Sequence, residues 1–247
     1  MVKNILVLGV IPIFVSAAKT FCFEDDQRVS SKEDEVGRIL PSKTGRIGRR
    51  RSATVCTATL ISEACALTAG HCVKHLKYVQ FNVPLSNANR TINHSAPSDI
   101  YLVDKDTIVY SAETVGDDWA VFKLQANKES GKLPGEIQGF LDISFDDYRP
   151  RKLKITGHGL DYSPGEFNYT QQTDEGDIVR LDGSTIHHLV DTQGGNSGST
   201  IRDRDTNRVI GIHTHAGCGD SRYLSNRGTS IARNTKLSQA IKKCLGY

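Results

Sequence analysis

The stretch Thr68-Ala69-Gly70-His71-Cys72 follows a short apolar segment, residues 64–68, that predicts a β-strand. A second stretch, Asp117-Asp118-Trp119-Ala120-Val121-Phe122, opens another apolar segment. A third, Gly194-Gly195-Asn196-Ser197-Gly198-Ser199, is a glycine-rich turn around a serine. Each stretch alone is common in proteins. In this chain order they supply an imidazole base, a carboxylate that can orient it and a hydroxyl nucleophile, which indicates hydrolytic chemistry.

Many short β-strands surround these motifs, and they are punctuated by turn residues. Strands are predicted over residues 54–61, 64–68, 78–83, 100–103, 107–110 and 120–124, and then over 152–156, 177–181, 185–189, 200–201, 209–213 and 228–231. Residues 128–139, rich in Gly, Lys and Pro, predict a linker between the two halves. The tail has apolar residues at helical spacing, which predicts a helix over residues 235–245. The pattern is that of an all-β barrel or sandwich closed by one helix.

Composition narrows the function classes. The chain has 247 residues, of which 38% are hydrophobic, so it can bury a substantial core and is not a disordered polymer. Its formal net charge is only +3, and one short basic run, residues 46–51, is present. A nucleic-acid partner is therefore not expected.

The N-terminal part predicts export and processing. Lys3 and the apolar run that follows it, residues 5–15, precede small residues, which is the layout of a signal peptide over residues 1–18. We expect a secreted or periplasmic protein with no membrane contact after signal removal. Residues 19–51 are interpreted as a propeptide that an activating protease cuts at Arg38 or Arg51, or alternatively as an extension that stays attached. The main domain is expected over residues 52–247.

In an exported chain, six cysteines are expected to form disulfides. The sequence contains no CxxC pair, which is the usual signature of a structural zinc site. Six cysteines allow fifteen pairings, and spacing does not choose among them. The partners of Cys22, Cys65, Cys218 and Cys244 therefore stay open.

The three motifs resemble those of the chymotrypsin-like serine peptidases, and within them the glutamyl endopeptidase (V8-like) branch, over residues 52–245. The resemblance implies two antiparallel β-barrels of the trypsin type, at about residues 52–127 and 140–234, with a C-terminal helix. It assigns His71 as general base, Asp118 as its orienting carboxylate and Ser197 as nucleophile. Asp117 is the competitor of Asp118 for the orienting role. The N–H groups of Gly195 and Ser197 are the expected oxyanion hole, since glycine leaves that turn uncrowded.

The resemblance also has consequences for covalent structure and activation. It implies a disulfide between Cys56 and Cys72, which flank the strand before His71. Asn196 stands where trypsin-like enzymes have an aspartate that pairs with a new N-terminal ammonium. A neutral amide cannot form that ion pair, so any maturation is expected to act differently.

Substrate preference is expected to depend on Asp191 and Thr192 on one wall of the specificity pocket and on His213, Thr214 and His215 on the other. By resemblance, Thr192 and His213 match the hydroxyl and imidazole that glutamyl endopeptidases direct at an acidic side chain. Asp191, however, has the spacing from the serine at which trypsin holds its pocket carboxylate, which would favour Lys or Arg. We expect acidic preference, with basic preference as the alternative. His213 and His215 alternate along one strand, but no metal and no cofactor are expected.

The sequence therefore predicts a secreted serine endopeptidase that acts on protein or peptide substrates. The rival hypothesis is a secreted serine-protease homologue that binds without cleaving, although no triad member is missing. A second rival is an enzyme of the same chemistry with very narrow specificity.

Overall fold

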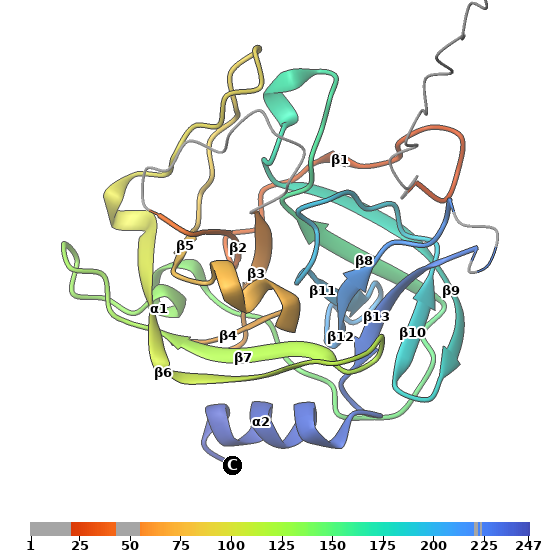
Figure 1. Cartoon of the computed structure of the whole chain (residues 1–247). Coiled ribbons are helices and arrows are strands. Elements are labelled where there is room, and N and C mark those ends of the chain that lie inside the picture. Colours follow the sequence, from red (N-terminus) through yellow and green to blue (C-terminus); the bar gives the residue numbers. More distant parts are fainter. Residues whose placement is uncertain (1–20, 43–54, 220–221, 223) are drawn as a thin grey trace, which may run out of the picture.

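The first half of the chain forms a closed β-barrel. The computed structural model describes residues 21–42, 55–219, 222 and 224–247. Six strands close the first barrel in the order β2-β3-β4-β7-β6-β5 (Figure 1). Their bounds are Val36–Leu40 for β2, Cys56–Leu60 for β3, Cys65–Thr68 for β4, Tyr78–Gln80 for β5, Ile100–Ala112 for β6 and Asp118–Leu124 for β7. Buried side chains of these strands, among them Leu60, Tyr101 and Phe122, form one apolar core with Phe81, which directly follows β5.

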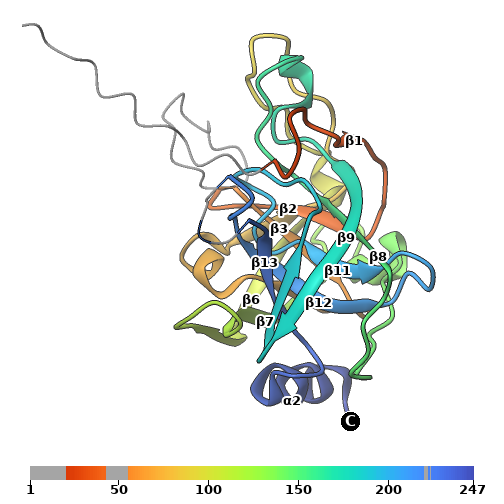
Figure 2. The same ribbon diagram turned by 90° about the vertical axis from the view of Figure 1, so that its right-hand side faces the viewer.

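The second half forms a second antiparallel barrel. Its strands pair in the order β9-β10-β13-β12-β11-β8, and pairing between β8 and β9 closes the ring. The bounds are Lys152–Gly157 for β8, Gln172–Asp182 for β9, Thr185–His188 for β10, Thr200–Asp203 for β11, Val209–His215 for β12 and Asn226–Ser230 for β13. A two-residue strand, β1 at Val29–Ser30, adds to the edge of β9 (Figure 2). The expected fold class, two trypsin-type barrels and a C-terminal helix, is confirmed.

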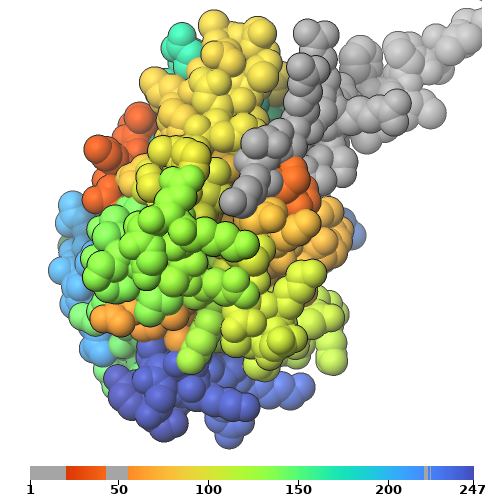
Figure 3. Space-filling model, turned by 90° about the vertical axis from the view of Figure 1, so that its left-hand side faces the viewer, coloured from red at the N-terminus to blue at the C-terminus, as the bar shows by residue number. Residues whose placement is uncertain are grey.

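The helices are few and short. The helix α2, Thr235–Leu245, begins after Asn234, whose side chain accepts a hydrogen bond from the Leu237 N–H, and it ends at Gly246 in a left-handed conformation. It follows the second barrel but packs against β7 of the first, and it covers one end of the molecule (Figure 3). The other helices among the described residues are α1 at Pro134–Gln138 and three 3₁₀ turns at Gly70–His75, Pro97–Asp99 and Gly165–Phe167. No described helix is long and apolar enough to cross a membrane.

An apolar cluster fixes the two barrels relative to each other. Leu67 and Trp119 of the first barrel belong to the same cluster of buried side chains as Val209 and Ile212 of the second, and side chains of α2 complete it. Burying an aliphatic or aromatic side chain of this size stabilises the fold by about 1.5–3 kcal/mol. The seam between the barrels is therefore a packed interface.

The N-terminal boundary of the first barrel differs from the expectation. The strand β2 pairs with β3 and β5, so residues 36–40 belong to the barrel and are not part of a detachable propeptide. Arg38 within β2 is fully buried and donates to Tyr169 O, Gln80 Oε1 and Asn93 O at 2.6–3.0 Å. A protease has no access to Arg38 in this fold, which corrects its assignment as a cleavage site. Arg51, Ser52 and the expected signal peptide lie outside the described residues.

All six cysteines are paired. The disulfide Cys56–Cys72 is present as expected. The remaining four form Cys22–Cys218 and Cys65–Cys244, which attach the two ends of the described chain to distant segments.

Candidate active site

His71 lies at the start of the 3₁₀ turn Gly70–His75, at the seam between the barrels. Gly70 is required there because a Cβ atom would overlap the backbone oxygen of Ser111 on β6. Two contacts fix the histidine to Asp118, the first residue of β7: its Nδ1 lies 2.6 Å from Asp118 Oδ2, and its backbone N–H donates to Oδ1 at 2.9 Å. The Asp118 side chain is 4% exposed and that of His71 is 41% exposed. A buried carboxylate thus holds a solvent-facing imidazole by one ring nitrogen.

Asp117, the competing carboxylate, has a different role. Its oxygens accept hydrogen bonds from Trp119 Nε1, Asn234 Nδ2 and Ser111 Oγ at 2.8–2.9 Å. Burial tends to raise its pKa, but these three donors hold the pKa of Asp117 below its usual value. Asp117 therefore anchors the start of α2, and the structure pairs only Asp118 with His71.

The serine-containing turn is docked on the first barrel. Gly195 has φ of 110°, and a Cβ atom there would overlap the His158 backbone oxygen, so only glycine fits. The Thr57 N–H on β3 donates to Ser197 O at 2.9 Å, and Cys72 Sγ lies 3.8 Å from the same oxygen. These contacts place the backbone of Ser197 next to Cys72, the residue that directly follows His71.

The turn leaves two N–H groups unused. Among the described residues, neither the Gly195 N–H nor the Ser197 N–H has a hydrogen-bond partner, whereas the neighbouring Asn196 and Gly198 N–H groups donate to Gln193 O and His213 O. Asn196 Oδ1 accepts from the Gln193 N–H at 3.0 Å. The asparagine thus holds the turn from within, with no need for an ammonium partner.

The residues expected in the specificity pocket lie together on the second barrel. Thr192 is 1% exposed and His213 is 3% exposed. The His213 ring contacts the His188 ring, and His213 Nδ1 lies 3.2 Å from His188 Nε2. Burial, followed by the neighbouring histidines, lowers the pKa of His213 well below its usual value, and burial lowers the pKa of His188 to about 3. Both imidazoles are therefore neutral at physiological pH.

The next two residues of β12 lie closer to the His71–Asp118 pair. Thr214 Oγ1 is 2.8 Å from His215 Nδ1, and His215 Nδ1 is 3.9 Å from Asp118 Oδ2. The register of β12 with β13 shifts between His213 and His215, so their side chains do not follow the simple alternation of a regular strand. Each ring nitrogen Nδ1 already has a neighbour within the protein, which gives no support to a metal site on these two histidines.

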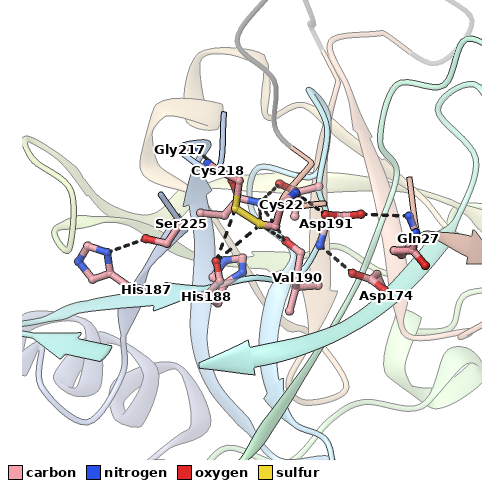
Figure 4. The surroundings of a disulfide bond; sticks show 12 residues. Cys22, Gln27, Asp174, His187, His188, Val190, Asp191, Gly217, Cys218 and Ser225 are labelled. Carbon is pink, nitrogen blue, oxygen red and sulfur yellow. Dashed lines mark hydrogen bonds between the residues drawn. A yellow bond between two sulfur atoms is a disulfide. The ribbon is translucent and has the colours of Figure 1, made fainter. Parts of the chain in front are cut away.

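Asp191 is buried at 1% exposure and does not stand free (Figure 4). Its Oδ1 accepts from the Cys22 N–H at 2.6 Å, and its Oδ2 accepts from the Gln27 N–H at 3.0 Å. Its own N–H donates to Asp174 Oδ2 at 2.7 Å. Burial raises the pKa of Asp191, while the two N–H donors act in the opposite direction.

Asn226 of β13 contacts the expected pocket residue Thr192, and the sequence motifs did not indicate it. Its Nδ2 donates to Thr192 Oγ1 at 3.1 Å and to Val190 O at 2.9 Å. Its Oδ1 accepts from the Gly217 N–H at 3.0 Å. No local motif marks this asparagine, because its importance comes only from the register of β13 against β10 and β12.

A metal ion is not needed to explain any cluster of ligand-type side chains in the described residues. One such cluster, Cys56, His71 and Cys72, combines a disulfide with the histidine that Asp118 holds. Disulfide sulfurs are not thiolates, so they are poor metal ligands.

Comparison with known proteins assigns the family. The sequence matches the family Trypsin over residues 42–235, which is most of the chain. The chain belongs to the trypsin family. Trypsin-family proteins are serine proteases, and this member is accordingly a serine endopeptidase. A comparison with curated protein sequences found no match.

Solved structures share the trypsin-family fold at low identity. A Glu endopeptidase in complex with MPD has a TM-score of 0.67 at 20% identity, over 92% of this chain and 100% of that one. The thermostable serine protease AL20 from an extremophilic microorganism has a TM-score of 0.63 at 14% identity, over 86% of this chain and 97% of that one. An inactivated protease paralogue of the scabies mite has a TM-score of 0.62 at 10% identity, over 90% of this chain and 98% of that one. Such identities establish the fold, and substrate preference has to be argued from the side chains.

Proposed function

We propose that this trypsin-family member hydrolyses peptide bonds through His71, Asp118 and Ser197, and that it prefers an acidic residue before the scissile bond. The observation that carries the proposal is the 2.6 Å contact between His71 Nδ1 and Asp118 Oδ2 beside the docked serine turn. This contact fixes the imidazole so that its other nitrogen, Nε2, faces away from the carboxylate and is available to a nucleophile.

The mechanism follows from these positions. His71 takes the proton of the Ser197 hydroxyl as the oxygen attacks the scissile carbonyl, and the buried Asp118 carboxylate stabilises the imidazolium that forms. The free N–H groups of Gly195 and Ser197 donate to the oxyanion of the tetrahedral intermediate. His71 then protonates the leaving amine, and water hydrolyses the acyl-enzyme with the same base.

The acidic preference rests on the chemistry of the polar side chains expected in the pocket. The Thr192 hydroxyl and the neutral His213 imidazole are hydrogen-bonding groups that carry no negative charge, so they suit a carboxylate. Both oxygens of Asp191, the group that would attract Lys or Arg, already accept N–H groups. The Glu endopeptidase among the structural neighbours is consistent with this preference.

Export is part of the proposal. Three disulfides with no free cysteine in the described chain are typical of an oxidising compartment, either outside the cell or in a periplasm. Appearance of the protein in the culture medium or periplasmic fraction, with all six cysteines resistant to alkylation, would test this point.

A scan of the residue before the scissile bond tests the catalytic proposal. The purified chain, retaining residues 21–42, is assayed on peptides that carry Glu, Asp, Lys, Arg or Leu at that position. We expect cleavage after Glu or Asp, and a loss of about 10⁴-fold or more in kcat/KM for Ser197→Ala. A fluorophosphonate should label the parent protein but not this variant.

A matched pair of variants tests the pocket. Thr192→Val removes the hydroxyl at constant shape, and Thr192→Ser keeps it. We expect Thr192→Val to lower kcat/KM for the Glu peptide by about tenfold and Thr192→Ser to lower it much less. Cleavage after Lys or Arg would contradict the acidic preference. Absence of fluorophosphonate labelling would contradict the triad and favour a binding homologue.

A further inference from the structure

The segment of residues 22–28, here called the strap, lies directly against Asp191 (Figure 4). The Cys22–Cys218 disulfide ties its first residue to the segment between β12 and β13. The two hydrogen bonds from the strap to Asp191 come from backbone N–H groups, those of Cys22 and Gln27, and each occupies a different carboxylate oxygen. The contact therefore depends on where the backbone runs and not on the chemistry of a side chain.

The backbone donors contact Asp191 directly, whereas the charge of the Arg28 guanidinium also acts to lower the pKa of Asp191, against the effect of burial, but forms no ion pair with it. No ion pair among the described residues includes Asp191, although its side chain is buried. A buried carboxylate outside any ion pair needs N–H donors to remain ionised. The strap supplies two of them, so it satisfies the group that would otherwise bind a cationic ligand.

The strap also contacts the pocket residues. Asp191 directly precedes Thr192, and Asn226 Nδ2, which donates to the Thr192 hydroxyl, lies 3.6 Å from Cys22 Sγ. The strap, Asn226 and Thr192 thus form one continuous set of contacts. A displacement of the strap would reach the pocket without passing through the barrel cores.

The strap is anchored beyond its disulfide. Arg28 is buried, pairs with Asp26 at 2.7 Å and donates to Leu160 O at 3.0 Å. The next residues form β1 on the edge of β9. Its position over Asp191 is therefore set by the folded barrel and does not depend on bound substrate.

We propose that the strap is a specificity-determining element: its Cys22 and Gln27 N–H groups occupy Asp191 and so deny the pocket a free carboxylate for Lys or Arg. The Thr192 hydroxyl and the His213 imidazole then remain as the polar groups that select the substrate. This inference rests on the proposed acidic preference and explains how the chain has that preference despite Asp191.

Removal of one N–H group tests the strap. Gln27→Pro deletes the backbone donor to Asp191 Oδ2, and Gln27→Ala is the matched control that keeps it. A double variant, Cys22→Ser with Cys218→Ser, releases the strap by an independent route. All are made in a Ser197→Ala chain, and the binding of benzamidine, an aromatic amidinium, is measured by calorimetry, so that turnover is not required.

We expect benzamidine to bind the Gln27→Pro chain and the double variant about 10- to 100-fold more tightly than the Gln27→Ala chain, since a hydrogen-bonded charge pair contributes that much. Adding Asp191→Asn should remove the gain. With Ser197 restored, the same variants should gain cleavage after Lys or Arg relative to Glu.

Unchanged benzamidine affinity in folded variants, or a gain that survives Asp191→Asn, would overturn the role of the strap. That failure differs from failure of the proposed function, which would appear in the parent chain as absent fluorophosphonate labelling or as preference for Lys and Arg. Because benzamidine binding is independent of catalysis, the strap can be tested even in an inactive protein.

Discussion

The two ends of the described chain each attach to the barrel to which they do not belong, but different forces hold them there. At the C-terminal end, α2 follows the second barrel and buries Leu237 and Ile241 against the first. At the N-terminal end, residues 22–33 precede the first barrel and bind the second through hydrogen bonds, a buried ion pair and β1. Each end carries one disulfide to a distant segment.

The difference shows which contacts a sequence reveals. The helix has apolar residues at regular spacing, so the spacing alone identifies the face that it buries. The N-terminal segment is acidic and irregular, and its partners are backbone atoms and charges more than a hundred residues away. Its sequence is typical of an exposed extension, whereas its contacts make it an integral part of the fold.

The largest expected effect comes from the ion pair at the N-terminal end. Glu33 Oε2 lies 2.5 Å from Arg202 Nη2, and the Arg202 side chain is 1% exposed. Glu33→Ala leaves a buried guanidinium without its counter-charge and should lower the free energy of unfolding by about 3–5 kcal/mol. Urea denaturation measures the change.

A surface ion pair serves as the control for Glu33. Asp177 and Lys152 lie 3.0 Å apart, but both side chains are about half exposed, so Asp177→Ala should change stability little. Equal losses for the Glu33 and Asp177 variants would mean that the N-terminal segment is only loosely attached, and the comparison between the two ends would fail.

A somewhat smaller effect is expected at the apolar end. Leu237 of α2 is fully buried in the cluster between the barrels, and Leu237→Ala should cost about 3 kcal/mol through lost burial and the cavity left behind. The neighbouring exposed residue Lys236 supplies a control, since Lys236→Ala should be nearly neutral. Thermal unfolding of both variants checks the prediction. Leu237→Ala should not change substrate preference, because only the N-terminal end contacts Asp191. A changed preference would contradict the distinction between the two ends.

The smallest effect concerns Asp174, which accepts the Asp191 N–H beside the strap. Burial raises the pKa of Asp174 from 3.8 to about 6. The folded state therefore binds a proton that the unfolded state has lost between these pH values, and this group's contribution to stability falls as pH rises from about 4 to about 6.

Asp174→Asn removes that titration. Relative to the parent chain, the variant should gain on the order of 1 kcal/mol between pH 4 and pH 7, an amount reduced by partial exposure of the carboxylate. Melting temperatures at both pH values measure the difference. A constant difference would show that burial does not raise the pKa of Asp174.

Much of the barrel architecture could be predicted from the sequence because barrel strands alternate apolar and polar residues. The expected strands at 100–103 and 107–110 proved to be parts of one long strand, β6, that continues through the polar residues between them. The strand β2 was missed because its central residues, Gly37 and Arg38, are unusual in a strand. Arg38 is buried only because carbonyl oxygens of distant segments accept its N–H groups, and burial lowers its pKa to about 9.

The residues of the candidate site also differ in how far the sequence predicts them. His71, Asp118 and Ser197 stand in recognisable local motifs, so their order in the chain predicts their roles. The choice of Asp118 over Asp117 agrees with the contact to His71 Nδ1. The setting of Asp191 could not be predicted, because it depends on a disulfide and on the course of the strap, which no local pattern specifies.

The disulfides at the two ends have a topological consequence. The loop closed by Cys22–Cys218 and the loop closed by Cys65–Cys244 overlap along the chain. A single peptide-bond cut anywhere between residues 22 and 244 therefore leaves both pieces in one covalent molecule, a cut at Arg51 included. A nicked molecule would migrate as one species on a non-reducing gel and as two after reduction. If one copy of the protease cut another at a single site, the overlapping disulfide loops would keep the two pieces joined. Such a cut would convert a one-chain form into a two-chain form and would not release a fragment.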